Sequence, residues 1–202
     1  MTLYIIIFTV IISVIAFSKH ELFYKFQFNA YQIKYDKQYH RFLTHGFIHA
    51  DWIHLLMNMF VLFFFGSAVE EYFAFLFQEK GAFYFILLYT GGILFAALPS
   101  YKRHQEHSYY NSVGASGAVS AVVFSSVIFD PARSICLYGV LCFPGVLWAI
   151  AYLVYSYYKG KKENDFINHD AHFWGAVFGA LFTIALKPAL ALHFIRRIID
   201  LI

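Results

Sequence analysis

Six long apolar blocks constrain the fold of this chain more than any other feature. They span about residues 2–18, 52–73, 80–98, 113–129, 137–158 and 171–187. The hydrocarbon core of a bilayer is roughly 30 Å thick, so a helix that rises about 1.5 Å per residue needs roughly 20 apolar residues to cross it. Pro99, Pro131 and Pro188 mark three block ends, because proline interrupts a helix. The sequence predicts an all-α membrane protein, a six-transmembrane-helix bundle forming one domain over 1–202.

The composition supports a membrane location. Hydrophobic residues make up 60% of the 202 residues and charged residues 13%, whereas soluble domains average about 45–50% and about 25%. A small soluble domain keeps most of its outside in water and cannot hide this much apolar surface. The net charge of +3 is too small to indicate a nucleic-acid partner. We therefore expect the lipid bilayer, and not nucleic acid, as a partner.

The first block could be a signal peptide or a retained span. It lacks a basic leading segment, and its run of about 16 apolar or small residues is long for a signal peptide. We predict an uncleaved first span. No transit peptide rich in Arg and Ser is evident, which favours a bacterial cytoplasmic membrane.

Two segments outside the blocks suit the membrane interface. Segment 19–51 mixes aromatic residues with lysines, as interfacial loops do. The tail, about 189–202, predicts an interfacial amphipathic helix, although a plain packing helix fits almost as well. Its apolar face consists of Leu190, Phe194, Ile198 and Leu201, with His193, Arg196, Arg197 and Asp200 elsewhere.

The two cysteines, Cys136 and Cys142, lie six residues apart in apolar surroundings without a CxxC motif. We interpret them as unpaired packing residues that say little about the redox compartment.

Three polar clusters interrupt the apolar blocks, and polar groups at membrane depth point to functional sites. The first contains His45, His49, His54 and Asn58. The second is Gly114-Ala-Ser116-Gly117, at the start of the fourth block. The third runs from Asp170 through His172 to Gly175 and Gly179, at the start of the sixth block.

Each cluster also has a structural interpretation. Ser116 can hydrogen-bond within its own helix, and Gly175 with Gly179 forms a common close-packing face. His45 and His49 have a helical spacing that metal ligands use, but no third ligand follows at a convincing spacing. We therefore expect interface or core histidines, no metal and no cofactor.

Connectivity brings the clusters together. With six alternating spans, the starts of spans two, four and six lie on one side of the bilayer, so His54, Asn58, Ser116 and His172 share a shallow depth. The small residues would let spans four and six approach closely.

Such a grouping has the parts of an acyl-transfer site. Ser116 needs an adjacent base, for which His172 is the candidate, and the oxyanion needs donors, which His54, Asn58 and the Ser116 backbone N–H can supply. Asp170 lies two residues from His172 and would point away from it. The sequence predicts a Ser–His dyad.

At this point the residues resemble the rhomboid family of intramembrane serine proteases. The resemblance rests on His54-xxx-Asn58, Gly114-x-Ser116-Gly117 and His172-xx-Gly175-xxx-Gly179, in this order. His45 and His49 keep the family's spacing, Arg41 matches the Arg of its first-loop Trp-Arg pair, and Gly66–Glu70 resembles the segment that closes the second helix. The similarity covers about 40 to 180.

The resemblance implies cleavage of single-span transmembrane proteins near the outer face, where the active site would open. It makes 19–51 a membrane-embedded first loop, and it makes span five and loop 159–169 the gate for substrate.

Three features depart from the family pattern. His40 replaces the tryptophan of the pair, and Ser120 stands where relatives often carry an aromatic ring that stacks on the catalytic histidine, which Phe173, Trp174 or another ring could replace. The third departure is the distribution of positive charge, because the positive-inside rule predicts the membrane orientation opposite to that of the family. Ten of the 15 Lys and Arg lie in loops that the family arrangement puts outside: Lys19, Lys25, Lys34, Lys37, Arg41, Lys102, Arg103, Lys159, Lys161 and Lys162.

Two other functions fit parts of the sequence. An inactive relative that binds membrane proteins would commonly lack Ser116 or His172, and both are present. A small transporter would commonly show paired repeats, and the sequence has no internal repeat.

Overall fold

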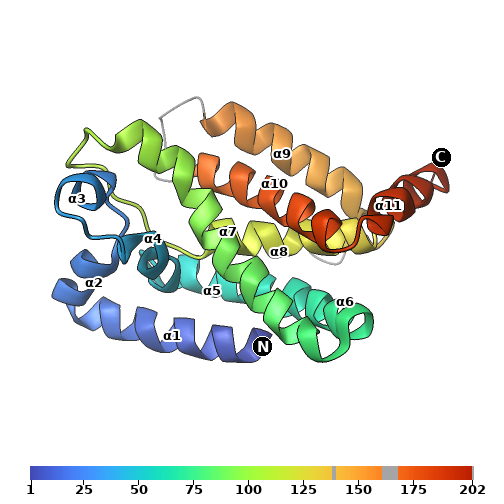
Figure 1. Ribbon diagram of the computed structural model, residues 1–202, viewed down its shortest axis with the longest axis horizontal. Helices are drawn as coiled ribbons and strands as arrows, with labels where there is room; N and C mark the ends of the chain where they lie inside the picture. Colours follow the sequence, from blue (N-terminus) through green and yellow to red (C-terminus); the bar gives the residue numbers. More distant parts are fainter. Residues whose placement is uncertain (138–139, 161–167, 202) are drawn as a thin grey trace.

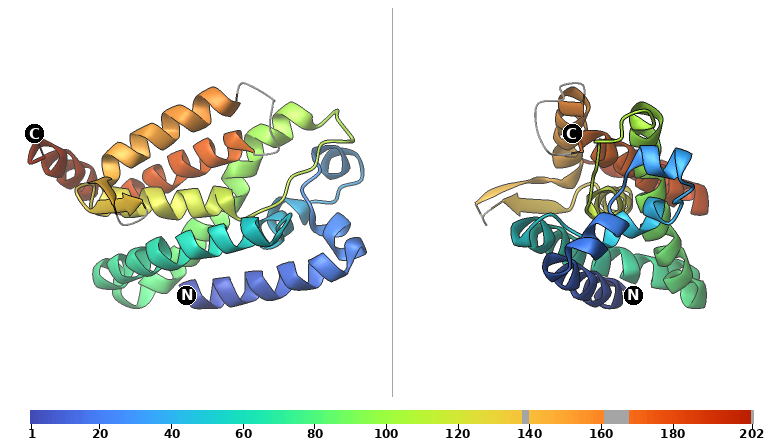
Figure 2. Two further views of the ribbon diagram at one scale, coloured as in Figure 1. Left: turned by 180° about the vertical axis from the view of Figure 1, so that it is seen from behind. Right: turned by 90° about the vertical axis from the view of Figure 1, so that its left-hand side faces the viewer.

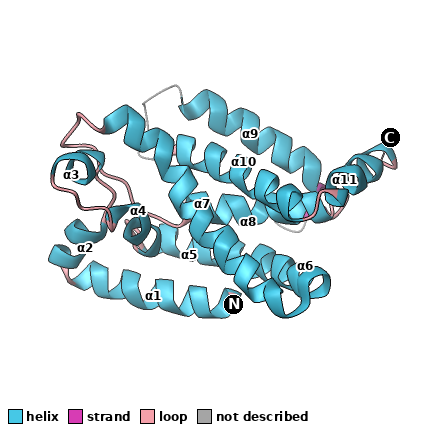
Figure 3. Cartoon of the chain, viewed as in Figure 1, coloured by secondary structure: helices cyan, strands magenta, loops and turns pink. Residues whose placement is uncertain are grey.

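The computed structural model describes residues 1–137, 140–160 and 168–201, and this part of the chain is mostly helical (Figures 1 and 3). The principal helices are α1 (Thr2–Ser18), α5 (Trp52–Val61), α6 (Ser67–Phe77), α7 (Gly81–His104), α8 (Ser116–Phe129), α9 (Gly145–Gly160), α10 (His169–Leu186) and α11 (Ala189–Ile199).

Helix α8 lies at the centre of the fold, between α7, α9 and α10, and α7 runs obliquely across α8 and α10 (Figure 1). Twelve of its fourteen residues are buried, and most of them are small or β-branched. Such residues let neighbouring backbones approach closely, which is the usual way in which helices associate in membranes. This packing fixes the first residue of α8, Ser116, against the surrounding helices.

Large apolar side chains lie on the outside of the bundle. On α1 the buried residues are small or polar, Thr2, Thr9, Ser13 and Ala16, whereas Tyr4 and Ile7 are more than half exposed. Ile53, Leu56 and Phe75 continue this apolar surface on α5 and α6. A surface of this kind suits contact with lipid rather than water.

The helix lengths by themselves do not establish six spans. Within the described residues, one helical stretch, Trp52–His104, is long and apolar enough to cross a membrane. A second is obtained if His169–Leu186 and Ala189–Ile199, which meet at a bend of 114°, are counted together. Helices Thr2–Ser18 and Ser116–Phe129 are apolar but shorter.

The second apolar block is longer than predicted and interrupted. The π-helical turn η2 (Leu62–Gly66) joins α5 to α6, and the 3-10 turn η3 (Gln78–Lys80) joins α6 to α7. Gln78 has a positive φ of 50°, so the chain reverses here and α7 packs back against α6.

Segment 19–51 folds as a compact cap and not as an extended loop. It contains α2 (His20–Phe26), α3 (Ala30–Tyr35), α4 (Arg41–Thr44) and the 3-10 turn η1 (His45–Phe47). Phe28 forms an antiparallel bridge with Ser112, which ties the cap to the segment before Ser116.

Two sequence predictions about these segments are wrong. Pro99 does not end a helix, because α7 continues through it to His104. The fifth helix begins at Gly145 and not at 137, since strands β1 (Ser134–Leu137) and β2 (Leu141–Pro144) form a hairpin that projects from the helices (Figure 2). Apart from this hairpin, the described part of the chain is mostly helical, in agreement with the predicted fold class. Most of the expected gate loop 159–169 falls at 161–167, outside the described residues.

The prediction that Cys136 and Cys142 are unpaired is also wrong. The two residues are direct partners in the antiparallel register of the hairpin, their Cα atoms lie 4.0 Å apart, and they form a disulfide. The apolar run 137–158 predicted a helix, and a helix cannot bring residues six apart face to face, so the sequence did not indicate this bond.

Candidate active site

Ser116 is the first residue of α8, and the backbone just before it has a special conformation. Gly114 has a φ of +118°, a region that side chains rarely adopt. A Cβ at Gly114 would also lie 2.6 Å from Cε1 of the His54 ring. Glycine at this position therefore lets His54 lie directly against the segment that leads into Ser116.

The predicted close approach of spans four and six is confirmed. A Cβ on Gly175 would lie 2.1 Å from the carbonyl oxygen of Gly117, and a Cβ on Gly179 would lie 2.0 Å from that of Ala121. Helices α8 and α10 thus touch backbone to backbone over two turns. His172 stands on α10 one turn before Gly175 and is brought beside the start of α8.

Ser116 and His172 line one cavity of about 490 Å³, which Asn58 also lines from α5. The rest of the lining is largely apolar and comes from α5, α8 and α9, with Val119, Val123, Phe124, Trp148 and Ala149 among its residues. Because the first amides of a helix have no acceptor within the helix, the Ser116 N–H is a hydrogen-bond donor beside the hydroxyl of the same residue.

His54 and Asn58 lie one turn apart on α5, as predicted. The Asp51 side chain caps this helix by accepting the His54 backbone N–H at 2.8 Å, and Asn58 Nδ2 donates to the His54 carbonyl at 2.9 Å. Asn58 is buried and retains a second amide hydrogen. The His54 ring packs edge-on against His49, with the centroids 5.0 Å apart.

His49 makes hydrogen bonds through both nitrogens of its ring. Its Nε2 accepts the Ala115 backbone N–H at 3.3 Å, so its ring proton lies on Nδ1 and is donated to Ser13 Oγ at 3.0 Å. The Ser13 hydroxyl in turn donates to the Phe47 carbonyl at 3.0 Å. This buried chain of hydrogen bonds ties α1 to the residue that precedes Ser116. Ser13 could not be predicted as part of the site, because a lone serine in an apolar block carries no signal.

His45 is likewise a buried structural residue, whose Nδ1 contacts the Arg41 carbonyl at 2.9 Å. The described part of the chain contains no group of three or more His, Cys, Asp or Glu that could hold a metal ion.

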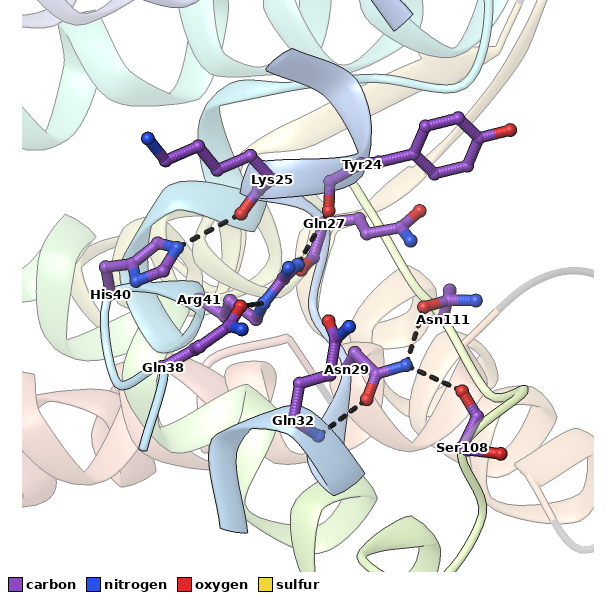
Figure 4. A pocket seen from close by; sticks show the side chains of 10 residues that line it. All are labelled: Tyr24, Lys25, Gln27, Asn29, Gln32, Gln38, His40, Arg41, Ser108 and Asn111. Atoms are coloured by element: carbon purple, nitrogen blue, oxygen red, sulfur yellow. Dashed lines mark hydrogen bonds between the residues drawn. The ribbon is translucent and has the colours of Figure 1, made fainter. Parts of the chain in front are cut away.

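Arg41 holds the cap together (Figure 4). Its Nη1 donates to the carbonyls of Tyr24 at 2.8 Å and Gln27 at 2.6 Å, and its Nε donates to Gln38 Oε1 at 2.7 Å. Arg41 is buried. His40, in the place of the expected tryptophan, contacts the Lys25 carbonyl at 3.1 Å.

The cap is joined to the loop before Ser116 by side chains of both segments. Asn29 Nδ2 donates to the Ser108 carbonyl and to Asn111 Oδ1, both at 2.9 Å (Figure 4). Lys34 forms an exposed ion pair with Glu106. The hydrogen bond from Lys34 lowers the pKa of Glu106, and the same bond raises the pKa of Lys34.

Asp170, two residues before His172, forms an ion pair with the end of α7. It pairs with Arg103 at 2.6 Å, while Asn168 caps α10 by accepting the Ala171 N–H at 3.0 Å. The ion pair with Arg103 links the start of α10 to the end of α7.

A tyrosine from a third helix lies beside His172. Tyr152 on α9 stacks on His172, with the centroids 6.0 Å apart and the planes at 22°. Phe173 packs instead against Tyr157 and Trp174. No periodicity in the sequence marks Tyr152, since the contact depends on how α9 packs on α10.

Comparison with known proteins identifies a family whose domain includes the residues of this candidate site. The family model of the Rhomboid domain matches residues 36–189, which is more than half of the chain.

Two plant proteins are among its relatives. The chain is 26% identical over 176 residues to RHOMBOID-like protein 12, mitochondrial, of Arabidopsis thaliana, covering 78% of this chain and 50% of that protein. It is 32% identical over 152 residues to Rhomboid-like protein 11, chloroplastic, of the same plant, covering 71% and 51%. The chain spans about half the length of these relatives, and their organellar names give no support to a bacterial membrane. The match over most of the chain shows that it belongs to the rhomboid family, and thus to a family of membrane proteins.

Proposed function

We propose that this chain is an intramembrane serine protease that hydrolyses peptide bonds in or near the transmembrane segments of single-span membrane proteins. One observation carries the proposal: Ser116 and His172 line the same cavity, at the place where α8 and α10 touch. Membership of the rhomboid family supports the same chemistry. The proposed fold is a six-span bundle in which segment 19–51 is a membrane-embedded cap.

In this mechanism Ser116 Oγ attacks the carbonyl carbon of the scissile bond while His172 takes the hydroxyl proton. A serine hydroxyl is a weak nucleophile, so this transfer is what makes the attack possible. His172 then gives the proton to the leaving amine, and an ester to Ser116 remains. Water, deprotonated by His172, attacks the ester and releases the second product. Each step needs only the dyad and water, with no metal or cofactor.

The oxyanion of the tetrahedral intermediate requires donors that are already in place. The Ser116 N–H, the His54 ring and the second amide hydrogen of Asn58 are the proposed donors. Fixed donors in a site with little water stabilise the developing charge strongly, and the apolar lining of the cavity suits this role.

The orientation in the membrane is proposed from two features at opposite ends of α8. The Ser116 end carries ten of the 15 Lys and Arg in its loops, and the other end carries the Cys136–Cys142 disulfide. Positive loops stay on the inner side, and disulfides persist in oxidising compartments. Both features favour a Ser116 end that faces inward, the reverse of the outward-facing arrangement that the resemblance implied.

Reconstitution in liposomes tests the activity. We expect the purified chain to cleave a single-span substrate with small residues near the membrane surface, and we expect Ser116→Ala and His172→Ala to abolish cleavage. Ser126→Ala, on the same helix but away from the cavity, serves as the matched control and should retain activity. Equal cleavage by the unmodified chain and Ser116→Ala would refute the mechanism.

Labelling by a fluorophosphonate probes the nucleophile without a peptide substrate. Ser116 should be labelled in the unmodified chain and in Ser126→Ala, but not in Ser116→Ala. Stable capture of the substrate with neither cleavage nor labelling would identify an inactive relative instead.

A further inference from the structure

Tyr152, outside the proposed dyad, stacks its ring on the ring of the proposed base. Its ring lies nearly parallel to that of His172, at 6.0 Å between centroids and 22° between planes. Both residues line the cavity that contains Ser116. Phe124 on α8 also packs against the phenol ring, with the ring centroids 6.0 Å apart and the planes tilted by 43°. The phenol thus contacts both the proposed base and the helix that carries the nucleophile.

The hydroxyl of Tyr152 is fixed as well as its ring. Its oxygen lies 2.7 Å from Ser120 Oγ, a hydrogen bond that either group can donate. Ser120 is buried and follows Ser116 by one turn of α8, so the two serines lie on one face of that helix. A tyrosine held at both its ring and its hydroxyl has a single orientation.

We propose that Tyr152 is a positioning residue for His172 and that Ser120 fixes Tyr152 in this role. The proposal rests on the proposed protease function. His172 must direct one ring nitrogen at Ser116, and a side chain of this kind can rotate out of line unless something packs against its face. A misplacement of about 1 Å can cost about 10²-fold in rate, so the packing of one ring has a measurable effect.

The orientation of His172 depends on a residue of α9. The nucleophile and Ser120 belong to α8 and the base belongs to α10, whereas the ring that orients the base belongs to α9. A displacement of α9 from α10 would remove the ring from His172 without moving Ser116. The orientation of the base is therefore tied to the position of a third helix.

Two substitutions at Tyr152 separate the ring from the hydroxyl. Tyr152→Leu removes the ring, and we expect kcat to fall by about 10- to 100-fold and KM to change much less, because a positioning residue acts on the step in which His172 takes the proton. Tyr152→Phe keeps the ring, and we expect it to retain activity within about threefold. Ser120→Ala, which frees the hydroxyl, should give an intermediate loss. The rate of fluorophosphonate labelling of Ser116 should follow kcat across the series.

A matched control and a rescue exclude a general effect on folding. Tyr158→Leu makes the same change at an exposed position of α9 and should leave kcat unchanged. In a Tyr152→Ala background, Ser120→Tyr restores a ring from α8 and should return part of the lost activity. Thermal unfolding of each variant gives the folded fraction.

The outcomes are distinguishable. An active chain whose kcat and labelling are unaffected by Tyr152→Leu would overturn the positioning role alone. A loss that matched the fall in folded fraction, or equal losses in Tyr152→Leu and Tyr152→Phe without rescue, would do the same. An unmodified chain that neither cleaves nor labels would overturn the protease proposal and the role of Tyr152 with it.

Discussion

Gly175 of α10 faces the backbone of Gly117 of α8 so closely that a Cβ on Gly175 would lie 2.1 Å from the Gly117 carbonyl oxygen. This contact brings the helix that carries His172 to the helix that begins at Ser116. The obstacle is backbone rather than a flexible side chain, so it cannot be relieved by a change of rotamer. The glycine pair is therefore the geometric basis of the proposed dyad.

Gly175→Ala should separate the two helices. Alanine favours a helix over glycine by about 1 kcal/mol, but overpacking in a tight core costs about 1–3 kcal/mol, occasionally more, so we expect a net loss of stability and of cleavage. Thermal unfolding in detergent and the liposome assay measure both. Gly145→Ala is the control for stability, because a Cβ at Gly145 lies no closer than 3.3 Å to its neighbours. Full activity of Gly175→Ala would contradict this account of the site.

His49→Ala should destabilise the chain near Ser116. The change leaves the Ala115 N–H without its acceptor and Ser13 without its partner, and a buried unsatisfied group costs about 1–3 kcal/mol. Thermal unfolding should show a larger fall for His49→Ala than for Ser13→Ala, because the Ser13 change leaves the bond from Ala115 in place. The reverse order would contradict the chain of hydrogen bonds. Addition of Zn²⁺ or of a chelator should change neither value, since His49 is a structural residue.

Asn58→Ala should lower kcat by about 10²–10³ with little change in KM, because an oxyanion donor acts only when the charge develops. Asn58→Asp keeps the size of the side chain but removes its donors, and we expect a comparable loss. Thermal unfolding of both variants measures how much stability is lost with the hydrogen bond from Asn58 to the His54 carbonyl, so that this loss can be separated from the fall in kcat. A rise in KM with kcat unchanged would instead assign Asn58 to substrate binding.

The disulfide provides a reporter of orientation. In sealed vesicles whose outer surface corresponds to the oxidising side, a membrane-impermeant reductant followed by an impermeant maleimide should label Cys136 and Cys142. A cysteine introduced as Lys102→Cys, in a Cys136→Ser and Cys142→Ser background, should stay protected until the vesicles are opened. The reverse pattern of labelling would place the Ser116 end outside.

Much of the site follows from residues that are close in sequence. His54 and Asn58 share a face of α5 because they are four apart, and the small residues around Ser116 and Gly175 predicted the contact between α8 and α10. The helical blocks themselves were placed to within a few residues for α1 and α10, since long apolar runs leave the backbone little alternative to a helix in lipid.

Other features depend on tertiary structure. The hairpin at 134–144 reads as an apolar run that a helix could equally occupy, so the pairing of Cys136 with Cys142 could not be inferred from the sequence. Continuation of α7 through Pro99 likewise depends on packing that compensates for the missing N–H.

Local sequence by itself determined most of the helices and the chemical groups of this protein, including the serine, the histidines and the glycines that admit close contact. Only the tertiary structure decided which ring rests on His172. The sequence shows Ser120 where a ring would be expected, and Tyr152 supplies that ring from another helix. Periodicity describes which residues share a face of one helix, whereas contacts between helices depend on how the helices pack against one another.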